Sequence, residues 1–219
     1  MNREWLTIPF AVHRASRMQV LLGHATAIPP LLEAMETRDP NSETTRQDFL
    51  KVLNALRVWE NSFASDGMLH QPITPSELDL PTPAYLLPDA CFDFVDVTHA
   101  NSLTHCWAFR IVCLLRLHSL ENRPSSNAVI ACAAKQDRLE EIASLCTMIC
   151  QGLPYLLQRE MSLYGSMSAG FPLHMVSESL QTLPLQDCKL ASWCTAIREQ
   201  VQSQRVAFYE DMAESRTVV

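Results

Sequence analysis

Apolar residues recur at helical spacing along most of this 219-residue sequence, and no stretch alternates regularly between apolar and polar residues. Residues three, four and seven positions apart share one face of an α-helix, whereas every second residue shares one face of a β-strand. One long segment carries on a single helical face Phe49, Leu53, Leu56 and Phe63, with Trp59 beside them. The pattern therefore predicts an all-α fold.

Breaks in the helical spacing divide the chain into six or seven helices of a single domain, residues 1–219. Pro29 and Pro30 are expected to interrupt the first helix, and Asn41 and Ser42 to cap the long helix that follows. The expected helices are about 11–25, a further turn or two at LLEAM, a long segment through Phe63, about 92–118, about 127–151, a glycine-bearing segment up to about Leu183, and about 186–208.

Proline, glycine and acidic residues mark the expected irregular parts. Gly152 and Pro154 should end the helix predicted at 127–151. Residues 64–90 hold five of the thirteen prolines and predict a long surface loop. The acidic residues near the end of the chain, within about 210–219, predict a solvated tail.

The stretch GSMSAGFPLHMV begins at Gly165 and holds two of only five glycines. We expect it to form a structural corner, in which Gly165 and Gly170 allow a turn or the close approach of a neighbouring helix. Pro172 would bend or begin the next helix, and Phe171 and Leu173 would point into the core. A cost of about 3–5 kcal/mol is then expected for Phe171→Ala.

A catalytic alternative for the same stretch is the nucleophile elbow, G-x-S-x-G, which follows a strand. The glycine before Ser166 and Ser168 stands one residue too early for that motif, and no strand is predicted ahead of it. The elbow predicts that replacing Ser168 abolishes a hydrolytic activity, whereas the corner predicts little effect.

The formal net charge is −7, and the 17 basic residues are scattered along the chain. Because nucleic-acid surfaces gather basic residues into a patch, we expect no direct nucleic-acid binding. The N-terminal MNREWLTIPF lacks a signal-peptide pattern, and no stretch approaches the roughly 18 charge-free apolar residues of a membrane span. A soluble protein without a membrane partner is expected.

The eight cysteines and seven histidines form no familiar metal-binding motif. Cysteines such as Cys113 and Cys146 lie in apolar stretches, which favours buried, reduced thiols in an intracellular protein. His99 and His105 are six residues apart and would lie on different faces of a helix. We therefore expect neither a metal nor a cofactor.

Other polar and aromatic patterns have structural explanations. Asp93 and Asp96 could share a helix face, but capping and first-turn placement explain them more simply. Residues 153–157, LPYLL, match the short L-x-x-L-L pattern, for which core packing is favoured. Trp107 and Trp193 are expected in the core. No catalytic, cofactor-binding or metal-ligating residue is assigned.

Two longer stretches carry a family resemblance. ANSLTHCWAFRIVCLLRLHSL resembles the alanine- and tryptophan-bearing helix of the fungal-specific transcription factor domain, the regulatory region of fungal zinc-cluster regulators. ICQGLPYLLQREMSLYGSMSAGFPLHMVSESL is similar to that family's most recognisable stretch, and Trp193 and Ile197 resemble its closing helix. WLTIP and IPPLLEAM fit its earlier part, so the resemblance spans about Trp5 to Tyr209 and rests on packing motifs.

The resemblance implies an all-helical regulatory domain in proteins that bind DNA elsewhere, through six cysteines holding two zinc ions. This sequence lacks that cluster: no C-x₂-C motif precedes Cys106 and Cys113, and the basic run is missing. DNA binding is therefore not carried over, and no zinc ligand is named. A fragment, a truncated product, a stand-alone regulatory domain and a domain recruited to another task remain open alternatives.

Two functions follow as expectations. The first is a regulatory domain of a fungal transcription regulator, for example of a secondary-metabolite gene cluster, located in the nucleus or alternatively the cytoplasm. Its partner would be a protein, an apolar small-molecule effector or a second copy of the chain in a homodimer. The second is a helical enzyme of fungal secondary metabolism that encloses an apolar substrate. A six-cysteine cluster upstream of Met1 would favour the regulator.

Overall fold

The computed structural model describes residues 14–37, 43–65, 70–80, 83–121, 128–183 and 188–216. Within these ranges the chain forms seven α-helices and a two-stranded sheet, in the order α1 (Arg17–Ala25), α2 (Ile28–Thr37), α3 (Glu43–Ser65), β1 (Gln71–Ile73), β2 (Cys91–Asp93), α4 (Val97–Glu121), α5 (Ala128–Leu156), α6 (Ser162–Thr182) and α7 (Cys188–Arg216). The prediction of an all-α fold is confirmed.

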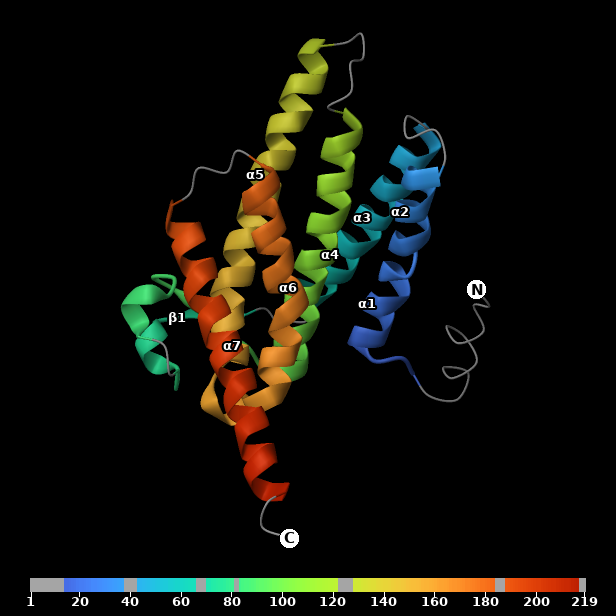
Figure 1. The fold of residues 1–219 in the computed structure, drawn as a ribbon. Helices are drawn as coiled ribbons and strands as arrows, with labels where there is room; N and C mark the ends of the chain where they lie inside the picture. Colours follow the sequence, from blue (N-terminus) through green and yellow to red (C-terminus); the bar gives the residue numbers. More distant parts are fainter. Residues whose placement is uncertain are drawn as a thin grey trace.

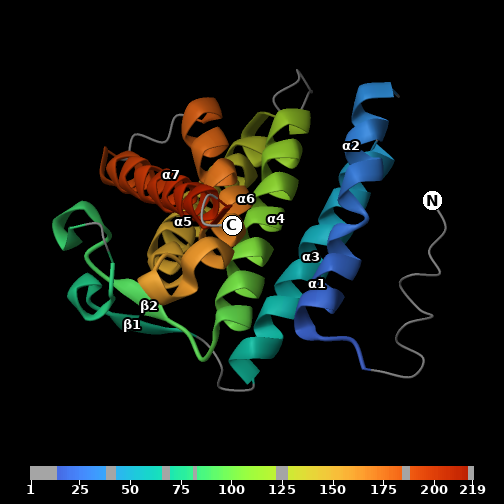
Figure 2. The ribbon, with the colours of Figure 1, turned by 60° about the horizontal axis from the view of Figure 1, so that its bottom comes forward.

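Helix α4 lies at the centre of the bundle and packs against α3, α5 and α6. Trp107 is fully buried on α4, and one hydrophobic cluster extends from Leu21 in α1 to Val201 in α7. In Figure 1, α4 to α7 run side by side, α1 and α2 lie on one flank, and the β1–β2 hairpin lies on the other. Figure 2 shows the same separation of the hairpin from α1 and α2 from another direction.

The N-terminal helices differ in one respect from the prediction. Helix α1 begins with a capping box in which the Ser16 hydroxyl accepts from the Gln19 amide and the Gln19 side chain accepts from the Ser16 amide. Pro29 and Pro30 do not interrupt a helix, because they lie in the first turn of α2. Proline is tolerated there since its missing N–H has no partner within the helix. The caps predicted at Asn41 and Ser42, and the start of the helix predicted at 11–25, lie outside the described residues.

The segment before α4 contains the strands that the sequence pattern missed. β1 and β2 pair antiparallel, with Pro72 opposite Phe92, so Phe92 belongs to a strand and not to the helix predicted from that residue. The His70 ring stacks on Phe92 at 3.6 Å between centroids and meets Trp107 at 5.8 Å. These ring contacts hold the hairpin against the core. Part of the predicted loop at 64–90 is therefore ordered on the bundle, and it also includes the short helical turns Pro75–Glu77 and Ala84–Leu86.

The predicted helix stops at Gly152 and Pro154 are wrong, because both residues lie inside α5. Gly152 lies at a close contact between helices: a Cβ there would lie 3.2 Å from Thr104 Cγ2 and 3.3 Å from Trp107 Cζ3. Gly152 thus lies where α4 and α5 pack closely against each other.

The predicted corner at 165–176 is also wrong as a turn, because Gly165, Gly170 and Pro172 all lie inside α6. The alternative of close approach is confirmed at Gly165, where a Cβ would lie 1.6 Å from the carbonyl oxygen of Leu156 in α5. Leu173 is buried, whereas Phe171 is only partly buried. The acidic segment predicted as a tail from about 210 is helical through Arg216 of α7.

No helix within the described ranges has a stretch long and apolar enough to cross a membrane.

Candidate functional site

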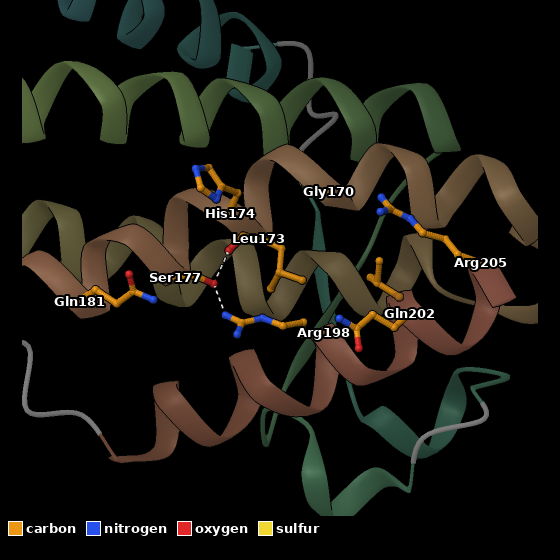
Figure 3. A pocket seen from close by; sticks show the side chains of 9 residues that line it. Gly170, Leu173, His174, Ser177, Gln181, Arg198, Gln202 and Arg205 are labelled. Atoms are coloured by element: carbon orange, nitrogen blue, oxygen red, sulfur yellow. Dashed lines mark hydrogen bonds between the residues drawn. The ribbon is translucent and has the colours of Figure 1, made fainter.

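A groove lined mainly by polar side chains lies between α6 and α7 (Figure 3). We call it the α6–α7 groove, and its cavity volume is about 330 Å³. The residues that line it are Gly170, Leu173, His174, Ser177 and Gln181 of α6 and Arg198, Val201, Gln202 and Arg205 of α7. Its size lies at the lower end of the range for small-molecule sites.

Helical spacing explains why these residues share one hollow. On α7, Arg198 and Arg205 are seven residues apart, so they lie on the same face with Val201 and Gln202 between them. The facing residues of α6 follow the same spacing of three or four positions. Leu173 and Val201 are nearly fully buried and form the apolar floor.

Arg205 reaches across the groove to α6. Its Nη2 donates a hydrogen bond of 3.0 Å to the carbonyl oxygen of Ser166. It passes so near Gly170 that a Cβ on that glycine would lie 2.9 Å from Nη2. Its Nε is buried and makes no hydrogen bond to the described residues.

Arg198 is held against α6 by a serine. The Arg198 Nη2 donates to Ser177 Oγ, and Ser177 Oγ donates to the carbonyl oxygen of Leu173 at 3.0 Å. Figure 3 shows the two guanidinium groups separated along the groove, with Leu173 between them. The groove therefore presents two cations, each hydrogen-bonded to α6, at either end of an apolar floor.

The charge balance of the groove is opposite to that of the whole chain. The formal net charge of the sequence is −7, yet among the described residues that line the groove none is acidic. The nearby carboxylate of Glu178 lies 3.7 Å from Arg116 Nη2 and 4.0 Å from His174 Nε2. This arrangement is suited to binding an anion.

A second polar cluster joins the three central helices and has a structural role. Arg110 of α4 forms ion pairs with Glu60 of α3 and Glu141 of α5, the latter at 2.5 Å. Trp107 Nε1 donates to Glu60 at 2.7 Å, and Arg57 also binds Glu141. Burial by itself would raise the pKa of Glu141, but the hydrogen bonds from Arg110 and Arg57 outweigh it and hold that pKa below its ordinary value.

The serines of the elbow alternative are not placed for nucleophilic catalysis. Ser166 is fully buried in α6, and Ser168 is partly buried on the same helix. The segment is helical from Ser162 onward, so the strand–turn–helix context of the elbow is absent from this described part of the chain. The hydrogen-bond partners of the groove serine, Ser177, among the described residues are Leu173, Cys194 and Arg198, and none of them is a histidine.

The two histidines His99 and His105 do not meet in one site, and neither do the two aspartates Asp93 and Asp96. Asp96 accepts from the His99 amide at 2.8 Å and caps α4, as predicted, whereas Asp93 is in β2 and accepts from the Phe94 amide. His99 pairs with Asp96, while His105 lies between Asn101 and the rings of α4 and α6. Burial lowers the pKa of His105, although its contact with the Asn101 carbonyl opposes this effect.

Six cysteines whose side chains the structure describes are buried, as predicted, and none of the six is in a disulfide: Cys91, Cys106, Cys113, Cys146, Cys150 and Cys194. Burial raises the pKa of Cys91, Cys113 and Cys146 to about 12, so these thiols stay protonated and are poor nucleophiles. Among the described residues, no group of three or more His, Cys, Asp and Glu side chains is placed to hold a metal ion.

The remaining apolar motif belongs to the core. Leu153, Leu156 and Leu157 of the LPYLL stretch are fully buried, which confirms core packing. Trp107 is also buried, as predicted, and Trp193 is only partly buried.

The sequence pattern did not identify the α6–α7 groove. Arg198 and Arg205 looked like scattered basic residues, although their spacing of seven with no acidic residue on the intervening face was a usable signal. The sequence alone does not show that Ser177 and Gly170 lie opposite these two arginines, because their placement depends on how α6 and α7 pack.

Comparisons with known proteins leave the family open. No protein-family model, no curated protein and no solved structure matches the chain.

Proposed function

We propose that this chain is an effector-binding regulatory domain of a transcription regulator of the fungal type, acting in the nucleus without contacting DNA itself. The observation that carries the proposal is the α6–α7 groove, which places Arg198 and Arg205 on an apolar floor inside an otherwise acidic molecule. The sequence resemblance to the fungal-specific transcription factor domain supports the same function.

The distribution of charge supports action without direct DNA contact. Several described cations are engaged with carboxylates, including Arg57 and Arg110 with Glu141 and Lys51 with Asp48. Phosphate binding needs free basic groups gathered on one face. The proposed domain therefore depends on a separate DNA-binding module.

The enzyme alternative receives no support from the groove. An enzyme acting on an apolar substrate needs an enclosed apolar site, whereas the α6–α7 groove is open and lined mainly by polar side chains.

A reporter experiment tests the proposed function. The full chain is fused to an unrelated DNA-binding module in a fungal cell, and transcription from a promoter with the matching sites is measured. We expect the fusion to change transcription at least several-fold relative to the module alone. A fusion that carries Ile111→Asp, which places a charge in the core, should lose the effect. An intact fusion with no effect on transcription would contradict the proposal.

A further inference from the structure

We infer that the α6–α7 groove binds a small dicarboxylate, with one carboxylate at Arg198 and the other at Arg205. The inference deepens the proposed function by naming the chemical class of the effector. It changes the earlier expectation of an apolar effector, because the ends of the groove are cationic and only its floor is apolar.

Both arginines keep donors for a ligand. A guanidinium carries five N–H groups. The contact of Arg205 with the described residues uses Nη2 alone, which leaves Nη1 for a ligand, whereas its unpaired Nε is buried. The contacts of Arg198 also involve only Nη2, which meets Ser177 Oγ and lies 3.8 Å from Cys194 Sγ. Each guanidinium can therefore bind one carboxylate through two parallel hydrogen bonds.

The spacing of the arginines favours two separate carboxylates over one. Seven residues of helix correspond to a rise of about 10.5 Å between the two Cα atoms. Leu173 lies between the two guanidinium groups (Figure 3). Val201, which stands between Arg198 and Arg205 on α7, also lines the groove, so the two side chains offer an apolar surface to the middle of the ligand. An aliphatic chain with a carboxylate at each end matches this order of cation, apolar floor and cation.

The direction of the side chains favours a small molecule over an acidic peptide. Arg198 and Arg205 both turn toward α6 and are tied to it through Ser177 and Ser166. Arg205 is partly buried and Arg198 is exposed, so the two guanidinium groups line the groove, one inside it and one at its rim. An acidic helix lying across the surface would instead need arginines that project outward.

Binding is tested by titration calorimetry of the full chain with dicarboxylates of increasing length, from succinate to sebacate, each compared with the monocarboxylate of the same length. We expect affinity to reach a maximum at one length, where the dicarboxylate binds about tenfold or more tightly than its monocarboxylate, since a second charged hydrogen-bonded contact is gained. Equal affinity of the paired compounds, no dependence on length, no binding at millimolar concentration, or tighter binding of an oligoglutamate peptide would overturn the inference.

A pair of variants with the same change in net charge tests the location. Gln202 is exposed and lines the groove, whereas the neighbouring Ser203 is exposed and does not. We expect Gln202→Glu to weaken binding of the best dicarboxylate by about tenfold through repulsion, and Ser203→Glu to leave it nearly unchanged. Equal effects of the two variants would place binding elsewhere. Neither change removes a core contact, so both variants should fold.

The binding experiments and the reporter experiment can fail independently, so they test the site and the function separately. Dicarboxylate binding that Gln202→Glu weakens, together with a silent reporter fusion, would sustain the site and reject the regulatory role. A fusion that changes transcription, but whose effect depends neither on added dicarboxylate nor on Gln202→Glu, would sustain the regulatory role and reject the α6–α7 groove as the effector site.

Discussion

Gly165 and Gly170 lie five residues apart in α6 but have different surroundings. A Cβ on Gly165 would overlap the backbone of Leu156, at 1.6 Å from its oxygen and 2.8 Å from its carbonyl carbon. A Cβ on Gly170 would meet only the end of the flexible Arg205 side chain, at 2.9 Å. The first glycine is therefore required by the contact between helices, whereas the second is not.

We expect Gly165→Ala to lower the free energy of unfolding by about 2 kcal/mol or more, because α5 and α6 must move apart. Gly170→Ala should range from no change to a gain of about 1 kcal/mol, since alanine favours the helix and Arg205 can shift. Urea unfolding followed by circular dichroism measures both. If the two variants lost the same stability, the close approach at Gly165 would not explain its presence.

The partial burial of Phe171 lowers the loss of stability expected when it is replaced by alanine. Its ring lies 5.1 Å from that of Phe109 and 5.8 Å from that of His105, but the side chain is only partly buried. We now expect Phe171→Ala to cost about 1–2 kcal/mol, below the range for a buried aromatic. Leu173→Ala, at a position only 5% exposed, should cost about 2–4 kcal/mol. A larger loss of thermal stability for Phe171→Ala than for Leu173→Ala would contradict this order.

At the scale of single elements, the sequence predicted which segments are helical better than where helices end. The apolar spacing of Phe49, Leu53 and Leu56 reappears as the buried face of α3. Pro154 and Pro172, in contrast, lie inside helices whose packing overrides the local preference against proline. The strands escaped notice because three residues are too few to show an alternating pattern.

The cluster around Arg110 connects α3, α4 and α5, and its charges determine how stability depends on pH. Arg110 has 13% of its side chain exposed, and its partners Glu60 and Glu141 have 16% and 21%. Because the folded pKa of Glu141 is lowered from 4.5, its contribution to stability is present above about that pH. The contribution is lost as the pH falls through the lower, folded value.

We expect Arg110→Met to lower the free energy of unfolding at pH 7 by about 3 kcal/mol, because it leaves two partly buried carboxylates without their shared cation. The difference from the parent should narrow as the pH falls below about 4.5, because Glu141 of the parent loses its charge as the pH passes through its lowered folded pKa. Urea unfolding at several pH values measures this. Arg159→Met is the control: it removes an exposed ion pair with Asp79 and should cost no more than about 0.5 kcal/mol. A loss independent of pH would contradict the role of the cluster.

At the scale of the whole molecule, the sequence predicted the fold class but could not predict the α6–α7 groove. Helical spacing is local and can be read from one segment at a time. The approach of Arg205 to Ser166 depends on two helices whose contacting residues are 39 positions apart. Residues that face each other through packing leave no local pattern, and the chain presents no chemical motif at this site that would identify it.

The continuity of the core predicts that the molecule unfolds as one unit. The same hydrophobic cluster includes Leu21 of α1, Trp107 of α4 and Val201 of α7. Helix α4 touches α1 and α3 on one side and α5 and α6 on the other, while α7 packs on α5 and α6. No helix pair can therefore separate without exposing apolar surface of the rest.

We expect a single cooperative transition in urea, with the same midpoint by far-ultraviolet circular dichroism and by tryptophan fluorescence. Circular dichroism reports all the helices, whereas Trp59 and Trp107 report the buried contact of α3 with α4. Trp193→Phe removes the reporter on α7 and should leave the fluorescence midpoint unchanged within about 0.2 M. The comparison is made in a Trp5→Phe background, so that Trp59, Trp107 and Trp193 are the tryptophans present before the change. If α6 and α7 formed a separate unit, the dichroism signal would fall in two steps and the fluorescence midpoint would shift on Trp193→Phe, because only the α3–α4 contact would still be observed.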